Sequence, residues 1–171
     1  MGFWDVLRGK RAQTSDSPAE QPIAPGDYGP GRLWKRVLVP ALDCPFSLRS
    51  VEVATRLAGA TKGSVNLAYF VEVPRAFALD AAIPESEIAA SEALEQARNS
   101  AAALQVPTDI SVHRTRSARD AILKLIVDEN IDILILGGRA DSARGLPVEL
   151  IRELFDRAPC EVALDYIPAG K

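Results

Sequence analysis

The strongest constraint on the fold is a regular alternation of short apolar segments with longer amphipathic or alanine-rich ones, from Trp34 to the end of the chain. In the apolar segments, apolar and polar residues do not alternate as they would in a half-exposed strand. Continuous apolar runs of this kind are typical of strands buried on both faces of a parallel sheet. Strands are predicted at residues 36–40, 64–71, 109–113, 131–136 and 160–166. Helices are predicted at residues 48–60, 85–104, from 117 onward and from 147 to 155, and residues 74–84 form either a loop or a broken helix. Ser47 is expected to cap the first of these helices and Ser117 the third.

Five strands separated by four helices predict an α/β fold, a doubly wound parallel five-stranded sheet with right-handed crossovers and helices on both faces. In such sheets a ligand binds beyond the carboxyl ends of the strands, where the strand order reverses. We therefore expect the functional residues in the loops after the first and fourth strands, at residues 41–47 and 137–147.

The first 33 residues differ in composition from the rest of the sequence. Residues 13–33 contain four prolines and three glycines among mostly polar residues, which predicts a flexible linker. Residues 1–12 form a short amphipathic segment in which Phe3, Trp4 and Leu7 share one face of a helix, followed by basic residues. This segment either frays or packs loosely on the domain, or it docks on a protein partner or a membrane surface. The globular domain is expected at residues 34–168.

Composition excludes several functional classes. Lys and Arg number 20 against 23 Asp and Glu, so the net charge of −3 argues against nucleic acid as a partner. One His and two Cys are too few for a structural zinc site or a disulfide framework, and a Ser-His-Asp triad could use only His113. The sequence has no apolar run of the roughly 18–20 residues that span a bilayer, and its beginning does not resemble a secretory signal. We expect a cytoplasmic protein with no metal site.

Four segments together resemble the universal stress protein family. They are Arg-Val-Leu-Val-Pro at 36–40, Phe-Val-Glu-Val-Pro at 70–74, Asp-Ile-Leu-Ile-Leu-Gly-Gly-Arg at 132–139 and Arg-Ala-Pro-Cys-Glu-Val at 157–162. The resemblance covers about residues 35–167 and implies an adenine nucleotide α-hydrolase-like fold with strand order 3-2-1-4-5. It also implies dimerisation and, in many members, ATP held by a glycine motif after the fourth strand, because glycines let backbone N–H groups approach phosphates.

The phosphate-binding motif that the resemblance implies is only partly present. Gly137 matches its first glycine and Arg139 a basic residue often found two positions on, whereas Ala140 takes the place of the second glycine. The final Gly-Ser or Gly-Thr pair falls on Val148 and Glu149, which puts a carboxylate where a phosphate would lie.

Two other ligand loops also depart from the family pattern. Leu42 takes the position of the adenine-contacting Asp, although a shift of one residue would bring Asp43 there. Arg116 stands where the family often has a glycine after the third strand. The candidate nucleotide or anion site comprises Ala41, Asp43, Val71, Arg116, Gly137, Gly138, Arg139 and Arg144.

These departures favour a non-enzymatic regulatory protein of the stress response with a degenerate nucleotide site, no catalytic residues and no cofactor. Two alternatives stay open: a true ATP-binding member with slow ATPase activity, and a soluble regulatory partner of a membrane transporter that Phe3, Trp4 and Leu7 would contact. Four arginines, at 114, 116, 139 and 144, are expected on loops at the carboxyl edge of the sheet. They are either solvated or paired with Asp43, Asp141 and Glu149, or they form a site for a different phosphorylated ligand or an acidic partner. We also expect a homodimer formed through the last strand, where Val162, Leu164 and Tyr166 share one face.

Overall fold

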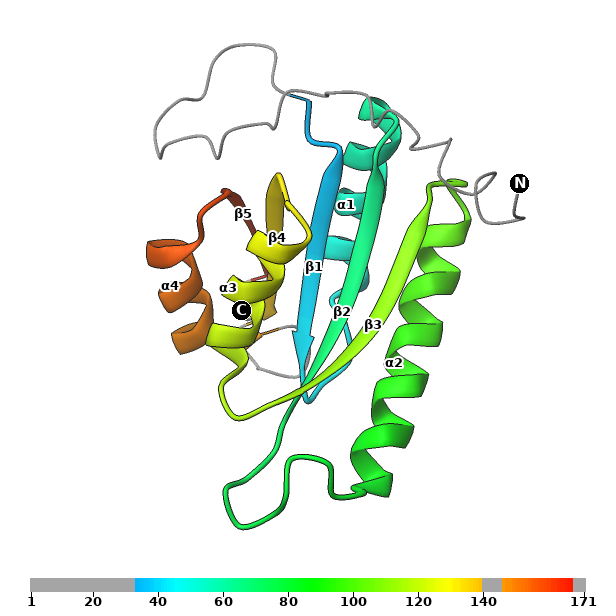
Figure 1. Cartoon of the computed structure of the whole chain (residues 1–171). Coiled ribbons are helices and arrows are strands. Elements are labelled where there is room, and N and C mark those ends of the chain that lie inside the picture. Colours follow the sequence, from blue (N-terminus) through cyan, green and yellow to red (C-terminus); the bar gives the residue numbers. More distant parts are fainter. Residues whose placement is uncertain (1–32, 140–145, 168–171) are drawn as a thin grey trace, which may run out of the picture.

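The computed structural model describes residues 33–139 and 146–167, and its centre is a five-stranded, all-parallel sheet (Figure 1). The strand order is β3-β2-β1-β4-β5, which confirms the predicted doubly wound α/β fold. The strands are β1 (Arg36–Leu42), β2 (Ser64–Glu72), β3 (Thr108–Thr115), β4 (Ile133–Arg139) and β5 (Glu161–Ile167). The helices are α1 (Leu48–Thr61), α2 (Pro84–Ala102), α3 (Ala118–Asp128) and α4 (Val148–Arg157). The predicted N-terminal segment at residues 1–12, nearly all of the predicted linker, and Arg144 lie outside the described residues.

Helices cover both faces of the sheet, as its continuously apolar strands require. Helices α1 and α2 pack on one face, where the core includes Val39, Leu67 and Ala97. Helices α3 and α4 pack on the other, around Leu38, Leu136 and Leu154. The strand order reverses between β1 and β4, which is the switch point of the sheet. The loops that follow these two strands therefore diverge at the carboxyl edge.

Polar side chains fix the starts of two helices. The hydroxyl of Ser47 accepts a hydrogen bond from the backbone N–H of Ser50 at 3.4 Å, and that of Ser117 accepts from Asp120 at 3.3 Å. Both serines satisfy backbone donors that a first helical turn leaves unpaired. These two caps were predicted from the sequence, whereas the start of α2 was placed one residue too late and its end two residues too late.

The connection between β2 and α2 consists of turns, which excludes the broken helix considered for residues 74–84. Its backbone bends twice, with hydrogen bonds from Phe77 N–H to Pro74 O at 3.0 Å and from Ala81 N–H to Ala78 O at 3.1 Å. In the described part of the chain no helix is both long enough and apolar enough to cross a membrane.

Candidate functional site

Asp43 ties the end of β1 to the end of β2 at the carboxyl edge of the sheet. Its backbone has a left-handed φ of 48°, and its N–H donates to Phe70 O at 3.1 Å. Its carboxylate accepts a hydrogen bond from the backbone N–H of Glu72 at 3.2 Å. Burial raises the pKa of Asp43, and the Glu72 hydrogen bond opposes part of that rise. Asp43, which the sequence suggested as a candidate ligand-binding acid, therefore lies between the ends of β1 and β2.

The two glycines at the end of β4 lie against the protein's own side chains. A Cβ atom at Gly137 would come within 2.3 Å of Ser50 Oγ and 2.8 Å of Ser47 Cβ, at the start of α1. A Cβ atom at Gly138 would come within 2.7 Å of Ile151 Cδ1, on α4. Gly137 therefore lies where α1 leaves little room for a side chain, whether or not a ligand binds there, whereas a side chain at Gly138 would have to displace only the flexible end of Ile151.

A carboxylate of β5 occupies the space beside Gly137. Asp165 pairs with Gly137 in the β4–β5 register. Its carboxylate accepts a hydrogen bond from Ser50 Oγ at 2.9 Å and lies 3.1 Å from Arg49 Nε. Ser50 and Arg49 belong to the first turn of α1, where a negative charge is favourable. The switch point therefore already holds a negative charge of the protein itself.

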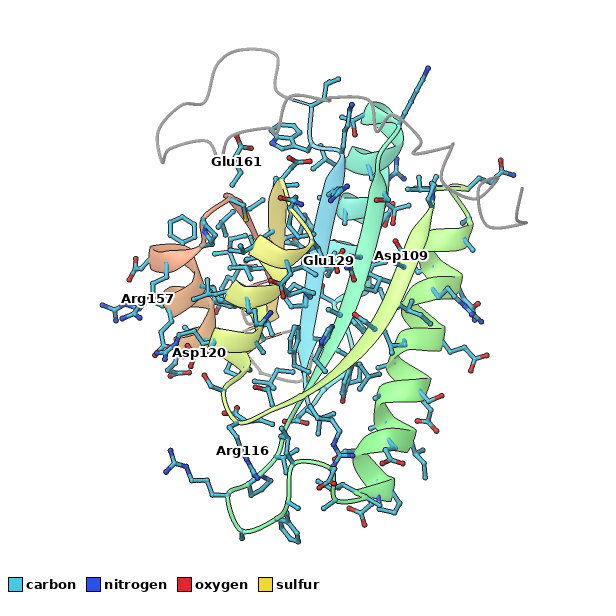
Figure 2. All side chains as sticks on the ribbon, viewed as in Figure 1. Asp109, Arg116, Asp120, Glu129, Arg157 and Glu161 are labelled. Atoms are coloured by element: carbon cyan, nitrogen blue, oxygen red, sulfur yellow. The ribbon has the colours of Figure 1, made fainter. Side chains whose placement is uncertain are left out.

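Arg116 binds the β2–α2 connection. Its guanidinium donates to the backbone carbonyls of Val73 at 2.8 Å and Phe77 at 2.6 Å, and also to that of Pro74. Figure 2 shows Arg116 at the end of the molecule where this connection lies. Three carbonyl acceptors satisfy much of the donor capacity of one guanidinium, so in this structure Arg116 holds protein backbone.

Arg114 supports the same connection from the neighbouring strand. It lies within β3 rather than on a loop, and its guanidinium donates to Leu79 O at 2.9 Å and to Ala81 O. It also pairs with Glu87 of α2 at 3.2 Å. Arg114 and Arg116 therefore both hold the backbone of residues 73–81 in place. The sequence suggested ion pairing or anion binding for them, but not this role.

The remaining predicted site residues are dispersed. Ala41 and Val71 are buried in the core on the α1 and α2 side. Arg139 ends β4, and Val148 and Glu149 begin α4 with exposed side chains. Of the eight candidates, the structure places Asp43 at a pocket, but it does not gather the others into one described cluster.

The pocket beside Asp43 has a volume of about 630 Å³ and lies between the end of β2, the β2–α2 connection and the start of α2. Its polar wall contains the carboxylates of Asp43, Glu72 and Glu85 and the phenol of Tyr69. Its other lining residues are Pro74, Phe77, Ala82, Ile83, Pro84, Ser86 and Ala89.

Tyr69 is one of the pocket residues that the sequence did not reveal. The residue is only 1% exposed, and its hydroxyl makes no hydrogen bond to another described residue. Burial and the nearby charge of Asp43 raise the pKa of Tyr69 to about 12. In the sequence, Tyr69 lies within an apolar strand and resembles a core residue. Its hydroxyl was the only feature that distinguished it from the apolar residues around it.

His113 is not part of this pocket. Its ring stacks on Phe70 with centroids 5.0 Å apart, and its Nε2 lies 2.9 Å from Ser111 Oγ. Burial lowers the pKa of His113. Among the described residues, no group of three or more His, Cys, Asp or Glu side chains could hold a metal ion.

The outer edge of β5 is partly apolar. Val162 packs partly against the core, whereas Leu164 is 49% and Tyr166 44% exposed. Near the opposite end of β5, Trp34 donates a hydrogen bond to Glu161 and, with Phe155 and Cys160, lines a second hollow of about 540 Å³.

Comparisons with known proteins agree on one family. The model of the universal stress protein family matches residues 33–164. A universal stress protein solved in complex with cAMP is 16% identical with a TM-score of 0.58, covering 79% of this chain and 98% of that one. The universal stress protein from Archaeoglobus fulgidus in complex with dAMP is 14% identical with a TM-score of 0.60, covering 78% and 98%. A universal stress protein family protein from Arabidopsis thaliana with AMP bound is 14% identical with a TM-score of 0.56, covering 79% and 93%.

At these identities the likeness is one of fold, and it agrees with the adenine nucleotide α-hydrolase-like arrangement of the sheet. No curated protein matches the sequence.

Proposed function

Because the chain belongs to the universal stress protein family, we propose that it is a non-enzymatic regulatory protein of the stress response whose ligand site no longer holds ATP. The observation that supports this proposal is the packing at the switch point. Gly137 lies against Ser47 and Ser50, and the carboxylate of Asp165 lies beside them. A triphosphate placed there would meet a negative charge in a partly buried setting, where charge repulsion is weakly screened.

The second candidate is a nucleotide-binding member of the family. Three similar structures carry cAMP, dAMP or AMP, and the Gly137–Arg139 segment keeps part of the family's glycine motif. Under this alternative Arg139 would contact a phosphate and Asp43 the base. Both candidates predict the same fold, so ligand content is what distinguishes them.

The deciding experiment measures ligand content and affinity on the full chain. The purified protein is denatured and the released small molecules are identified by mass spectrometry. ATP, AMP and cAMP are then each added at about 1 mM in a thermal-shift assay, in which a ligand present at 100 times its Kd would stabilise the fold by about 2.7 kcal/mol. We expect no co-purified nucleotide and no shift with any of the three.

Co-purified ATP, or a shift that is lost in the Arg139→Ala variant, would contradict the proposal and favour the nucleotide-binding alternative. A shift that Arg139→Ala leaves intact but Asp43→Asn removes would also contradict the proposal, because it would place the nucleotide at the end of β1.

We further propose that the protein acts in the cytoplasm as a homodimer formed through β5.

A further inference from the structure

The pocket beside Asp43 has a negatively charged lining. Asp43, Glu72 and Glu85 contribute carboxylates, and the described residues around it include no Lys or Arg. Arg114 and Arg116, which hold the connection, donate to its backbone carbonyls. A cation in the pocket would find three opposite charges among the described lining residues.

The same pocket contains an unpaired hydrogen-bonding group. Tyr69 lines the pocket and is only 1% exposed as a whole residue, and its hydroxyl makes no hydrogen bond to another described residue. One oxygen of the adjacent Asp43 carboxylate accepts from Glu72 N–H, which leaves the other oxygen available to a ligand. A ligand with N–H donors would pair with both the carboxylate and the phenol oxygen.

The rest of the lining is apolar. Phe77, Ile83, Pro74 and Ala82 supply the apolar part of the lining. Arg116 holds the segment around Phe77 by binding the carbonyls of Val73 and Phe77. Aromatic faces attract cations, and a volume of about 630 Å³ lies within the range of small-molecule sites.

We propose that this pocket binds an organic cation, an ammonium or guanidinium group carried on an apolar or aromatic body. The charged group would lie between Asp43 and Tyr69, and the apolar body would lie against Phe77 and Ile83. This inference rests on the proposed function, because it assigns a ligand class to a site that has lost ATP.

The probes are 2-phenylethylammonium and its uncharged analogue 2-phenylethanol, titrated into the full chain by calorimetry. We expect the ammonium to bind at least about tenfold more tightly, since a charge-assisted hydrogen bond to a carboxylate is lost in the alcohol. In NMR spectra, the ammonium should shift the signals of Phe77, Ile83 and Ala89 and leave those around Phe155, in the second hollow, unchanged. Equal affinity for the two probes, or shifts centred on Phe155, would overturn the proposal.

Variants of the full chain identify the groups involved. Asp43→Asn keeps the size of the side chain and should weaken ammonium binding about tenfold or more, and Tyr69→Phe should weaken it severalfold. Glu95→Gln, an exposed position of α2 outside the pocket, is the matched control and should bind like the parent. Thermal melting shows that each variant is folded. Unchanged affinity in Asp43→Asn would overturn the proposal.

Failure of this inference and failure of the proposed function give different results. If the chain binds ATP, the proposed function fails, and ATP that displaces the ammonium would overturn this inference as well. If neither the ammonium nor any nucleotide binds, the cation site alone is wrong.

Discussion

At the scale of single residues, Gly137 shows how closely α1 packs against the end of β4. Its missing side chain leaves room for Ser50 Oγ, which would be 2.3 Å from a Cβ atom. We therefore expect Gly137→Ala to lower the free energy of unfolding by about 1–3 kcal/mol, because overpacking forces neighbouring atoms to move. Urea denaturation followed by circular dichroism measures this change.

Gly59 provides the matched control. It lies within α1, and a Cβ atom there would meet only the flexible end of Val106, at 3.3 Å. Gly59→Ala should leave stability unchanged or raise it by up to about 1 kcal/mol, since alanine is the better helix former. Equal losses in the two variants would show that the contacts of Gly137 with α1 are not the cause.

His113 makes stability depend on pH in a defined direction. Burial lowers its pKa below the ordinary value of 6.5, and the charge of Glu129 opposes part of that shift. The unfolded chain therefore binds the proton more tightly than the folded one. The stabilisation is fully present above about pH 6.5 and is lost as the pH falls through the lower pKa of the folded protein.

The His113→Gln variant, which carries no titrating ring, should show a flatter decline of stability between about pH 7 and 5 than the parent. Urea denaturation across this range measures the two slopes. Identical slopes would mean that groups other than His113, such as the carboxylates of the same protein, dominate the acid response.

At the scale of elements, the β2–α2 connection depends on arginines from outside it. Arg116 donates to the carbonyls of Val73, Pro74 and Phe77. Lysine cannot reproduce a planar fork of donors, so Arg116→Lys should release this segment. We expect amide hydrogen exchange at Phe77 and Ala81 to accelerate about tenfold, with a global loss of about 1–2 kcal/mol.

Arg75 is the control for this experiment because it is an exposed arginine of the same connection. Arg75→Lys should leave the exchange of Phe77 and Ala81 at the rates of the parent. If both variants accelerate exchange alike, replacing any arginine of this connection by lysine has that effect, and the carbonyl contacts of Arg116 do not explain it.

The elements themselves were predictable because their signals are local. Apolar runs separated by helix formers gave the five strands and four helices, and the serines at 47 and 117 gave two helix starts. The partners of Arg114 and Arg116 were not predictable. They are backbone carbonyls about 30 to 40 positions away in sequence, and a carbonyl is present at every residue whatever its side chain. The pocket was missed for the same reason, since it exists only once this connection is held against α2.

At the scale of the whole molecule, the sheet has two edges, formed by β3 and β5 (Figure 1). The β5 edge carries Leu164 and Tyr166, which are 49% and 44% exposed, and Val148 and Phe155 on α4 add further exposed apolar area. Unpaired strand edges and apolar patches favour association. At the β3 edge, Ile110 and Val112 are also exposed, so exposure alone does not decide which edge pairs.

A pair of lysine substitutions tests the proposed dimer. Leu164→Lys in β5 and Val112→Lys in β3 change side chains that are both 49% exposed, so their effects on folding should be similar. In sedimentation velocity at about 10 µM, a concentration at which a dimer with a micromolar Kd is well populated, we expect the parent and Val112→Lys to sediment as dimers. Leu164→Lys should sediment as a monomer, because two lysines would be buried against each other across a twofold axis. A monomeric parent, or a dimer lost only in Val112→Lys, would show that β5 is not the interface.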